Sequence, residues 1–171
     1  MRAEAERQYG DFVAARAAPL VRFAFLLCGD WHRAEDTVQS ALVKLYLAWP
    51  RLSRVGAVEP YTRRIILRVL ADTGRRAWFR RERVSDRLPE PRAADGSDAA
   101  DDRMVLLSAL AALPPRQRAV VLLRFWEDQS VEQCAEALGC SEGTVKSQAA
   151  RGLQTLRNVL GDQFLASKGR G

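Results

Sequence analysis

The segment 113–157 constrains the fold of this chain more than any other because it holds start and stop signals for successive helices. Pro115 suits the first position of a helix, where its missing N–H would have no partner. Ser130 opens a capping-box pattern for a second helix, and Gly139 can end that helix in a left-handed conformation. Ser141 can cap a third helix one turn later. Two helices joined by so short a turn predict a helix-turn-helix.

The third of these helices has an apolar face that should pack on the helices before it, formed by Val145, Ala149, Gly152, Leu153 and Leu156. Its outer face has short polar residues, which lets a helix enter a DNA major groove of about 12 Å width. A recognition helix contacts base edges from its N-terminal residues, while Lys and Arg bind phosphates. The predicted DNA-binding residues are therefore Ser141, Glu142, Gly143, Thr144, Lys146, Ser147 and Arg151. A helical hairpin with a solvated outer face is the alternative.

Two stretches of this segment, LPPRQRAVVLLRFWED and GCSEGTVKSQAARGLQTLR, closely resemble region 4 of bacterial sigma-70-type RNA polymerase sigma factors. The short chain with two helical modules is similar to the extracytoplasmic-function (group 4) branch, and KSQAARGL resembles its SigE-like actinobacterial subset. The resemblance implies an all-α fold of two small helical domains joined by a flexible linker. It also implies binding to core RNA polymerase and promoter-specific initiation, with the third helix recognising the −35 element.

The positive charge of the chain is concentrated in residues 61–83. This segment has eight arginines and only two acidic residues, Asp72 and Glu82, so its own net charge is +6. Arginines can follow the backbone of a single strand while rings such as Trp78 and Phe79 stack on its bases, at ~1–3 kcal/mol per base. Unstacking a base costs a few kcal/mol, so this surface could hold open a melted duplex. The predicted contact residues are Arg64, Arg68, Arg75, Arg76, Trp78, Arg80 and Arg81. The alternative is a helix with solvated arginines and Trp78 in the core.

The same segment resembles sigma regions 2.3–2.4, which implies recognition and melting of the −10 element. Asp72 followed by Arg75 and Arg76 fits the family's pattern of an aspartate before a basic pair. Arg68 departs from it, because many members have asparagine there. Gly74 costs ~1 kcal/mol relative to alanine inside a helix, which predicts a helix break near this residue.

Residues 31–49 predict another helix, capped by Asp30 and ended by Pro50, after an earlier helix over 11–28 that Pro19 should kink or restart. Its polar face indicates, on composition alone, a solvated surface. However, GDWHRAEDTVQSALVKLYLAW resembles sigma region 2.2. The resemblance implies that this face binds the coiled coil of the polymerase β′ subunit through Glu35, Asp36 and Gln39.

Residues 84–103 are polar, net acidic and interrupted by Pro89, Pro91 and Gly96, which predicts a flexible linker. By resemblance this linker would follow the active-centre and RNA-exit path of the polymerase, although a passive tether explains the composition equally well. The second module would bind the β-subunit flap. The predicted organisation is a first helical domain over 8–83, an acidic linker over 84–103, a second helical domain over 104–161 and a disordered tail over 162–171.

Motifs for catalysis or metal binding do not occur in the sequence: it has no phosphate-binding loop, nucleophile elbow or HExxH pattern. Cys28, Cys134 and Cys140 form no CxxC pair, and His32 has no second ligand at a suitable spacing. We expect no cofactor and no metal, Cys134 packed inward, and Cys134 with Cys140 only as a remote alternative redox pair.

Two further expectations concern location and partners. No apolar run approaches the ~18 residues of a membrane span, and the N-terminus lacks the hydrophobic region of a signal peptide, so we predict a cytoplasmic protein. Expected partners are core polymerase, promoter DNA and, by resemblance, an anti-sigma factor. The rival functions are a stand-alone helix-turn-helix regulator and a nucleic-acid enzyme that uses 61–83 as a groove.

Overall fold

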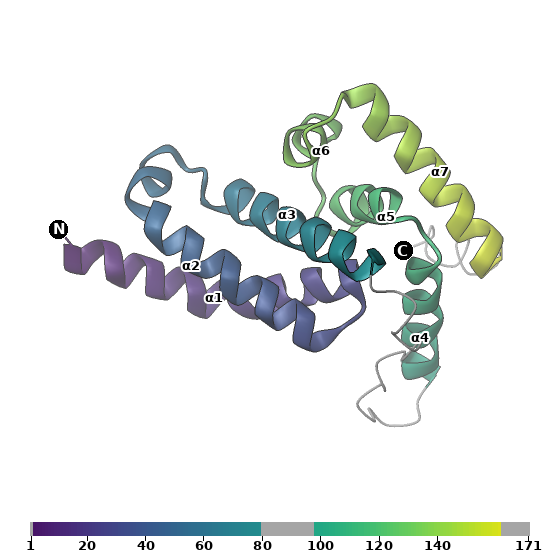
Figure 1. Cartoon of the computed structure of the whole chain (residues 1–171), viewed down its shortest axis with the longest axis horizontal. Coiled ribbons are helices and arrows are strands. Elements are labelled where there is room, and N and C mark those ends of the chain that lie inside the picture. The colour runs from purple at the N-terminus through teal and green to yellow at the C-terminus, as the bar shows by residue number, and fades with distance from the viewer. Residues whose placement is uncertain (1, 80–97, 162–171) are drawn as a thin grey trace. The chain divides into compact units, whose positions relative to one another are not determined.

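The computed structural model of this chain describes residues 2–79 and 98–161, with the backbone alone at residues 74–79 and 98 (Figure 1). Within these ranges every regular element is a helix. The chain divides into two compact units, Met1–Asp86 and Arg87–Gly171, which we call unit 1 and unit 2. The predicted all-α class is confirmed.

The described part of unit 1 contains three helices, α1 (Arg2–Cys28), α2 (Trp31–Val55) and α3 (Val58–Phe79). Helix α2 packs against both α1 and α3. Apolar side chains at helical spacing meet between the three helices, and the largest of those that are fully buried are Phe23, Val38, Leu45 and Ile66. This core fixes which face of each helix remains exposed.

The junction of α1 and α2 is set by local signals, as predicted. Gly29 ends α1 with a φ of 74°, in the left-handed region that favours glycine. The Asp30 side chain then accepts a hydrogen bond from the Arg33 N–H at 3.1 Å and caps α2. The end of α1 and the start of α2 therefore lie where the sequence signals place them, whereas α1 begins at Arg2, before the predicted residue 11.

The prediction that Pro50 ends α2 is wrong, because α2 continues to Val55 and ends at Gly56 with a φ of 66°. Leu52 lies beyond the proline and is buried with Leu45 and Trp49. This packing offsets the backbone hydrogen bond that proline cannot donate.

Two other predicted interruptions are also absent from the described helices. Helix α1 continues through Pro19 without restarting, and α3 continues through Gly74. In α1, several residues after the proline are buried, among them Leu20 and Phe23. A glycine inside a helix costs only ~1 kcal/mol of stability relative to alanine. The packing of α3 on α2 can stabilise the helix by more than this cost.

Unit 2 contains α4 (Asp98–Ala111), α5 (Pro115–Val121), a π-helical turn η2 (Leu122–Trp126), α6 (Val131–Leu138) and α7 (Glu142–Leu160). Pro115 occupies the start of α5, as predicted. Helix α7 packs against α4, α5 and α6. The core of this unit includes Leu110, Val120, Leu123, Cys134 and Val145.

Helix α4 begins at Asp98, within the segment for which a linker to residue 103 was predicted. The residues that break periodicity, Pro89 and Gly96 among them, all come before this helix. Ala99 and Ala100 are strong helix formers, and Asp101 lies near the N-terminal end of the helix dipole, where negative charge is favourable. The acidic character that indicated a linker therefore also suits the start of a helix.

Candidate nucleic-acid interface

The helix-turn-helix of unit 2 begins with a complete capping box. The Ser130 Oγ accepts a hydrogen bond from the Gln133 N–H at 3.0 Å, and the Gln133 Oε1 accepts one from the Ser130 N–H at 2.8 Å. Gly139 ends α6 with a φ of 65°. The predicted helix-turn-helix signals are therefore confirmed in their geometry.

Helix α7 has its own cap only a few residues later. The Ser141 Oγ accepts a hydrogen bond from the Thr144 N–H at 3.1 Å and lies 2.9 Å from the Thr144 Oγ1. The Ser147 hydroxyl donates to the Thr144 carbonyl at 3.1 Å. Ser141 and Thr144 thus stabilise the helix start, while the side chains beyond them remain available for contacts.

The two faces of α7 separate as the sequence pattern predicts. Val145, Gly152 and Leu156 are buried against the rest of unit 2. The exposed residues of the predicted DNA-binding set are Ser141, Glu142, Gly143, Lys146, Ser147 and Arg151, whereas Thr144 is half-buried. The N-terminal half of α7 therefore presents short side chains with two cations, a surface that fits a major groove.

Gly152 brings α7 close to α5. A Cβ atom at this position would lie 2.6 Å from the Val121 Cγ2 and 3.5 Å from the Gln117 carbonyl oxygen. The first distance is shorter than real Cβ contacts, so only glycine fits without movement. The sequence placed Gly152 on the apolar face but gave no measure of this close approach.

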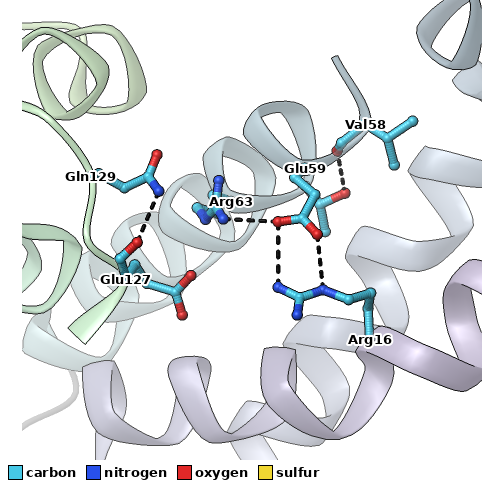
Figure 2. Close-up of polar contacts among 7 residues, drawn as sticks. Arg16, Val58, Glu59, Arg63, Glu127 and Gln129 are labelled. Atoms are coloured by element: carbon cyan, nitrogen blue, oxygen red, sulfur yellow. Dashed lines mark hydrogen bonds and ion pairs between the residues drawn. The ribbon is translucent and has the colours of Figure 1, made fainter. Parts of the chain in front are cut away.

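The turn between α5 and α6 has an exposed aromatic pair that sequence reasoning did not single out. Phe125 and Trp126 are both about half exposed. They lie in the π-helical turn, where the Arg124 guanidinium donates to the Gln129 carbonyl at 2.6 Å. The Gln129 amide in turn donates to the Glu127 carbonyl at 2.9 Å (Figure 2). These bonds fold the chain into the start of α6.

In unit 1, not every arginine of the basic segment is equally available. The Glu59 carboxylate accepts from the Arg63 Nη2 at 2.8 Å and pairs with the Arg16 Nε at 2.9 Å, which joins α1 to the first turn of α3 (Figure 2). Arg64 is half-buried and Arg68 is exposed. Arg63 therefore has a structural ion pair, while Arg68 faces solvent.

The remaining predicted −10 residues follow along α3 or lie after it. Arg75, Arg76 and Trp78 belong to α3, but their side chains are outside the described part of the structure, as are Arg80 and Arg81 altogether. Just before them, Thr73 receives hydrogen bonds from Arg33 of α2, a residue that sequence reasoning did not identify.

The polar face predicted on α2 is exposed. Glu35, Asp36 and Gln39 all face solvent on the first turns of the helix. Further along the helix, this face becomes apolar, with Val43 62% and Leu47 77% exposed. Val43 and Leu47 lie one helical turn apart, and apolar side chains exposed next to one another are a feature of interaction surfaces.

The described ranges contain neither a metal-binding cluster nor a membrane span. None of their His, Cys, Asp and Glu side chains forms a group of three or more that could hold a metal ion. Among the same residues, no helix has the length and apolar character needed to cross a membrane.

Two helical units, one with a capped helix-turn-helix and the other with a basic helix, define a class of DNA-binding transcription proteins. Comparison with known families agrees. The family model for sigma-70 region 2 matches residues 12–80, and that for sigma-70 region 4 matches residues 103–156.

Relatives match over nearly the whole chain. The RNA polymerase sigma-E factor of Streptomyces avermitilis is 34% identical over 165 residues, covering 94% of this chain and 89% of the relative. The ECF RNA polymerase sigma factor SigL of Mycobacterium tuberculosis is 35% identical over 151 residues, with 84% of each chain covered. The chain belongs to the sigma-70 family of RNA polymerase sigma factors, in its extracytoplasmic-function (ECF) branch. It is a specificity factor for transcription initiation and not an enzyme.

Solved structures share the fold. The sigma factor RpoE of Bartonella quintana, in complex with the anti-sigma factor NepR, has a TM-score of 0.74 at 22% identity and covers 90% of this chain and 97% of that one. The structure of CnrH in complex with the cytosolic domain of CnrY has a TM-score of 0.68 at 22% identity and covers 92% of this chain and 93% of that one.

Proposed function

We propose that this sigma factor directs core RNA polymerase to promoters by recognising the −35 element with α7 and by capturing and opening the −10 element with α3. The observation that supports this most directly is the division of α7. Its buried face anchors the helix, and its capped N-terminal half exposes Glu142, Gly143, Lys146 and Ser147. These side chains would contact base edges, with Arg151 on a phosphate.

The −10 role of α3 is supported by charge and chemistry. Residues 61–83 hold the basic concentration of the chain, and Arg68 is exposed on α3. Stacking of Trp78 and Phe79 on unpaired bases would supply ~1–3 kcal/mol per base, comparable with the cost of unstacking them. Arg64, Arg75, Arg76, Arg80 and Arg81 would follow the strand backbone.

Binding to core polymerase would use both units. The exposed face of α2, with Glu35, Asp36 and Gln39, would bind the β′ coiled coil, and unit 2 would bind the β flap. Two modules on one chain gain through effective concentration, so neither needs high affinity alone. The protein would act in the cytoplasm, together with the polymerase.

An anti-sigma factor is a further proposed partner. The two structural neighbours named above were each solved with a bound partner protein, which for RpoE is an anti-sigma factor. The apolar end of the exposed α2 face would suit a protein partner of this kind.

Run-off transcription tests the proposed function. Core polymerase, the purified chain and a promoter identified by mapping transcript 5′ ends should yield a run-off transcript, whereas core polymerase alone should not. A chain with Lys146→Ala and Arg151→Ala serves as the matched variant and should yield less transcript. Binding to the duplex without any transcript would instead indicate a stand-alone helix-turn-helix regulator.

A further inference from the structure

Arg33 lies in the first turn of α2 but contacts α3. Its Nη2 donates to the Leu70 carbonyl at 2.9 Å and to the Thr73 Oγ1 at 2.8 Å, and its Nε lies 3.3 Å from the same Oγ1. Arg33 and Thr73 are 40 residues apart in the chain. A guanidinium has its donors in a rigid planar fork, so contacts to two acceptors define an orientation as well as a separation.

The α2 end of this contact is held in place by its own backbone. The N–H of Arg33 donates to the Asp30 carboxylate at 3.1 Å, and the N–H of Ala34 donates to the Asp30 carbonyl at 2.9 Å. Ala34 is fully buried. The guanidinium therefore extends from a capped and packed helix start rather than from a loop.

At the α3 end, the contact lies directly before Gly74 and the proposed −10-binding residues. The Thr73 hydroxyl donates to the Val69 carbonyl at 2.9 Å, which directs its free lone pairs toward Arg33. Gly74 follows directly and is a weak helix position, at ~1 kcal/mol below alanine. Arg75 and Arg76, which are proposed to bind the −10 strand, come next in the same helix.

We infer that Arg33 is a positioning residue for promoter opening, which fixes the −10-binding end of α3 through the Leu70 carbonyl and the Thr73 hydroxyl. This inference rests on the proposed −10 function of α3. The turn of α2 that holds Arg33 also exposes Glu35 and Asp36 on another face. The same turn therefore links the proposed polymerase contact to the strand-opening segment.

Promoter opening by the holoenzyme measures this role directly. The probe is a duplex promoter with 2-aminopurine in its −10 element, whose fluorescence rises when the bases unstack. Arg33→Ala should slow opening roughly tenfold, as expected for loss of hydrogen bonds from a charged donor. Thr73→Val should have a similar effect, whereas Thr73→Ser, which keeps the hydroxyl, should open at the wild-type rate.

A double-mutant cycle tests whether the two side chains act as one contact. Arg33→Ala with Thr73→Val should open about as slowly as Arg33→Ala alone, because Arg33→Ala already removes the interaction with Thr73. Arg33→Lys should be intermediate, since it keeps the charge without the fork. Arg51→Ala, which removes an exposed arginine from the same helix, is the matched control and should leave the rate unchanged.

Affinity for core polymerase separates positioning from folding. Core affinity should be unchanged in every variant, while the opening rate falls only in the Arg33→Ala, Arg33→Lys and Thr73→Val variants and in the double variant. Parallel losses of core affinity and opening rate would indicate a purely structural role and overturn the inference, as would a wild-type rate in Arg33→Ala or multiplicative losses in the double variant. If the wild-type holoenzyme itself fails to open the duplex, the proposed function is overturned and the inference with it.

Discussion

At the residue scale, neighbouring side chains of α7 have different roles: some stabilise the helix and others face solvent. Ser141 caps the helix, Val145 is buried in the core, and Lys146 and Ser147, directly after Val145, face solvent. Because stabilisation and the proposed DNA contact use different residues, substitutions on the exposed face should alter binding without unfolding unit 2.

The double substitution of Lys146→Ala and Arg151→Ala is expected to weaken promoter binding and to reduce the salt dependence of binding by about one to two units of slope. For each cation removed from the protein, binding releases about one fewer counterion from the DNA. The measurement is the binding constant of the holoenzyme over a salt series. Arg157→Ala, at the C-terminal end of α7, is the control. An unchanged slope in the double variant would mean that neither cation contacts phosphate.

The buried thiol of Cys134 should make the stability of unit 2 sensitive to alkaline pH. Burial raises the pKa of Cys134 above its ordinary value of 9.0, and nearby Arg124 opposes part of this rise. The folded state therefore holds the proton more tightly than the unfolded state. Its contribution to stability is complete below pH 9 and is lost as the pH rises through the folded pKa.

Thermal unfolding across this alkaline range tests the effect. Tm should fall above about pH 9, and Cys134→Ala should make the decline less steep. Cys28→Ala removes a half-buried thiol from unit 1 and should leave the pH dependence as it is. An equal decline in the wild type and in Cys134→Ala would exclude this thiol as the cause.

At the element scale, the position of α7, the proposed recognition helix, depends on how closely it approaches α5. Gly152 is the residue that permits the approach, because a Cβ would overlap Val121. Valine is β-branched and cannot easily turn its methyl group away. Any larger residue must therefore push the two helices apart or distort their packing.

Gly152→Ala is expected to destabilise unit 2 by ~1–3 kcal/mol, as overpacking does in a filled core. Denaturant unfolding measures the change, and Gly152→Ala combined with Val121→Ala should recover part of the loss. Gly10→Ala in α1 is a matched control, because nothing lies within 4 Å of a Cβ there. That variant should be neutral or slightly more stable, since alanine favours helix.

Helix α2 also has a buried face and an exposed face. One face packs on α1 and α3, and the exposed face is proposed to bind polymerase. Asp36→Arg reverses a charge on the exposed face and should impair holoenzyme assembly while leaving Tm unchanged. Asp11→Arg makes the same reversal at an exposed site on α1 and should assemble normally. Affinity for core polymerase is the measurement, and unaffected assembly of Asp36→Arg would remove this face from the interface.

At the scale of the whole molecule, the features that local chemistry determines could be predicted from the sequence. The caps at Asp30, Ser130 and Ser141 and the turn at Gly139 depend on a few adjacent residues, and the structure confirms them. The buried and exposed faces of α7 followed from helical periodicity in the same way.

Features that depend on tertiary packing could not be predicted. Pro50 ends a helix by local rules, but burial of Leu52 keeps α2 intact. The π-helical turn at Leu122–Trp126 has no recognised sequence signal, and the contact of Arg33 with Thr73 requires two helices to be placed first. The exposure of the candidate site residues was therefore predictable where they lie on one helix, whereas contacts that join two helices were not predictable.

The independence of the inner and outer faces of α7 has an evolutionary consequence. After duplication of this gene, substitutions at the exposed residues of α7 could direct one copy to a new set of promoters, if these residues bind DNA as proposed. The buried residues of the helix would stay unchanged. Sequence differences between such paralogues should then concentrate at positions 142, 143, 146, 147 and 151. Substitutions at these positions can change promoter preference without lowering the stability of the fold.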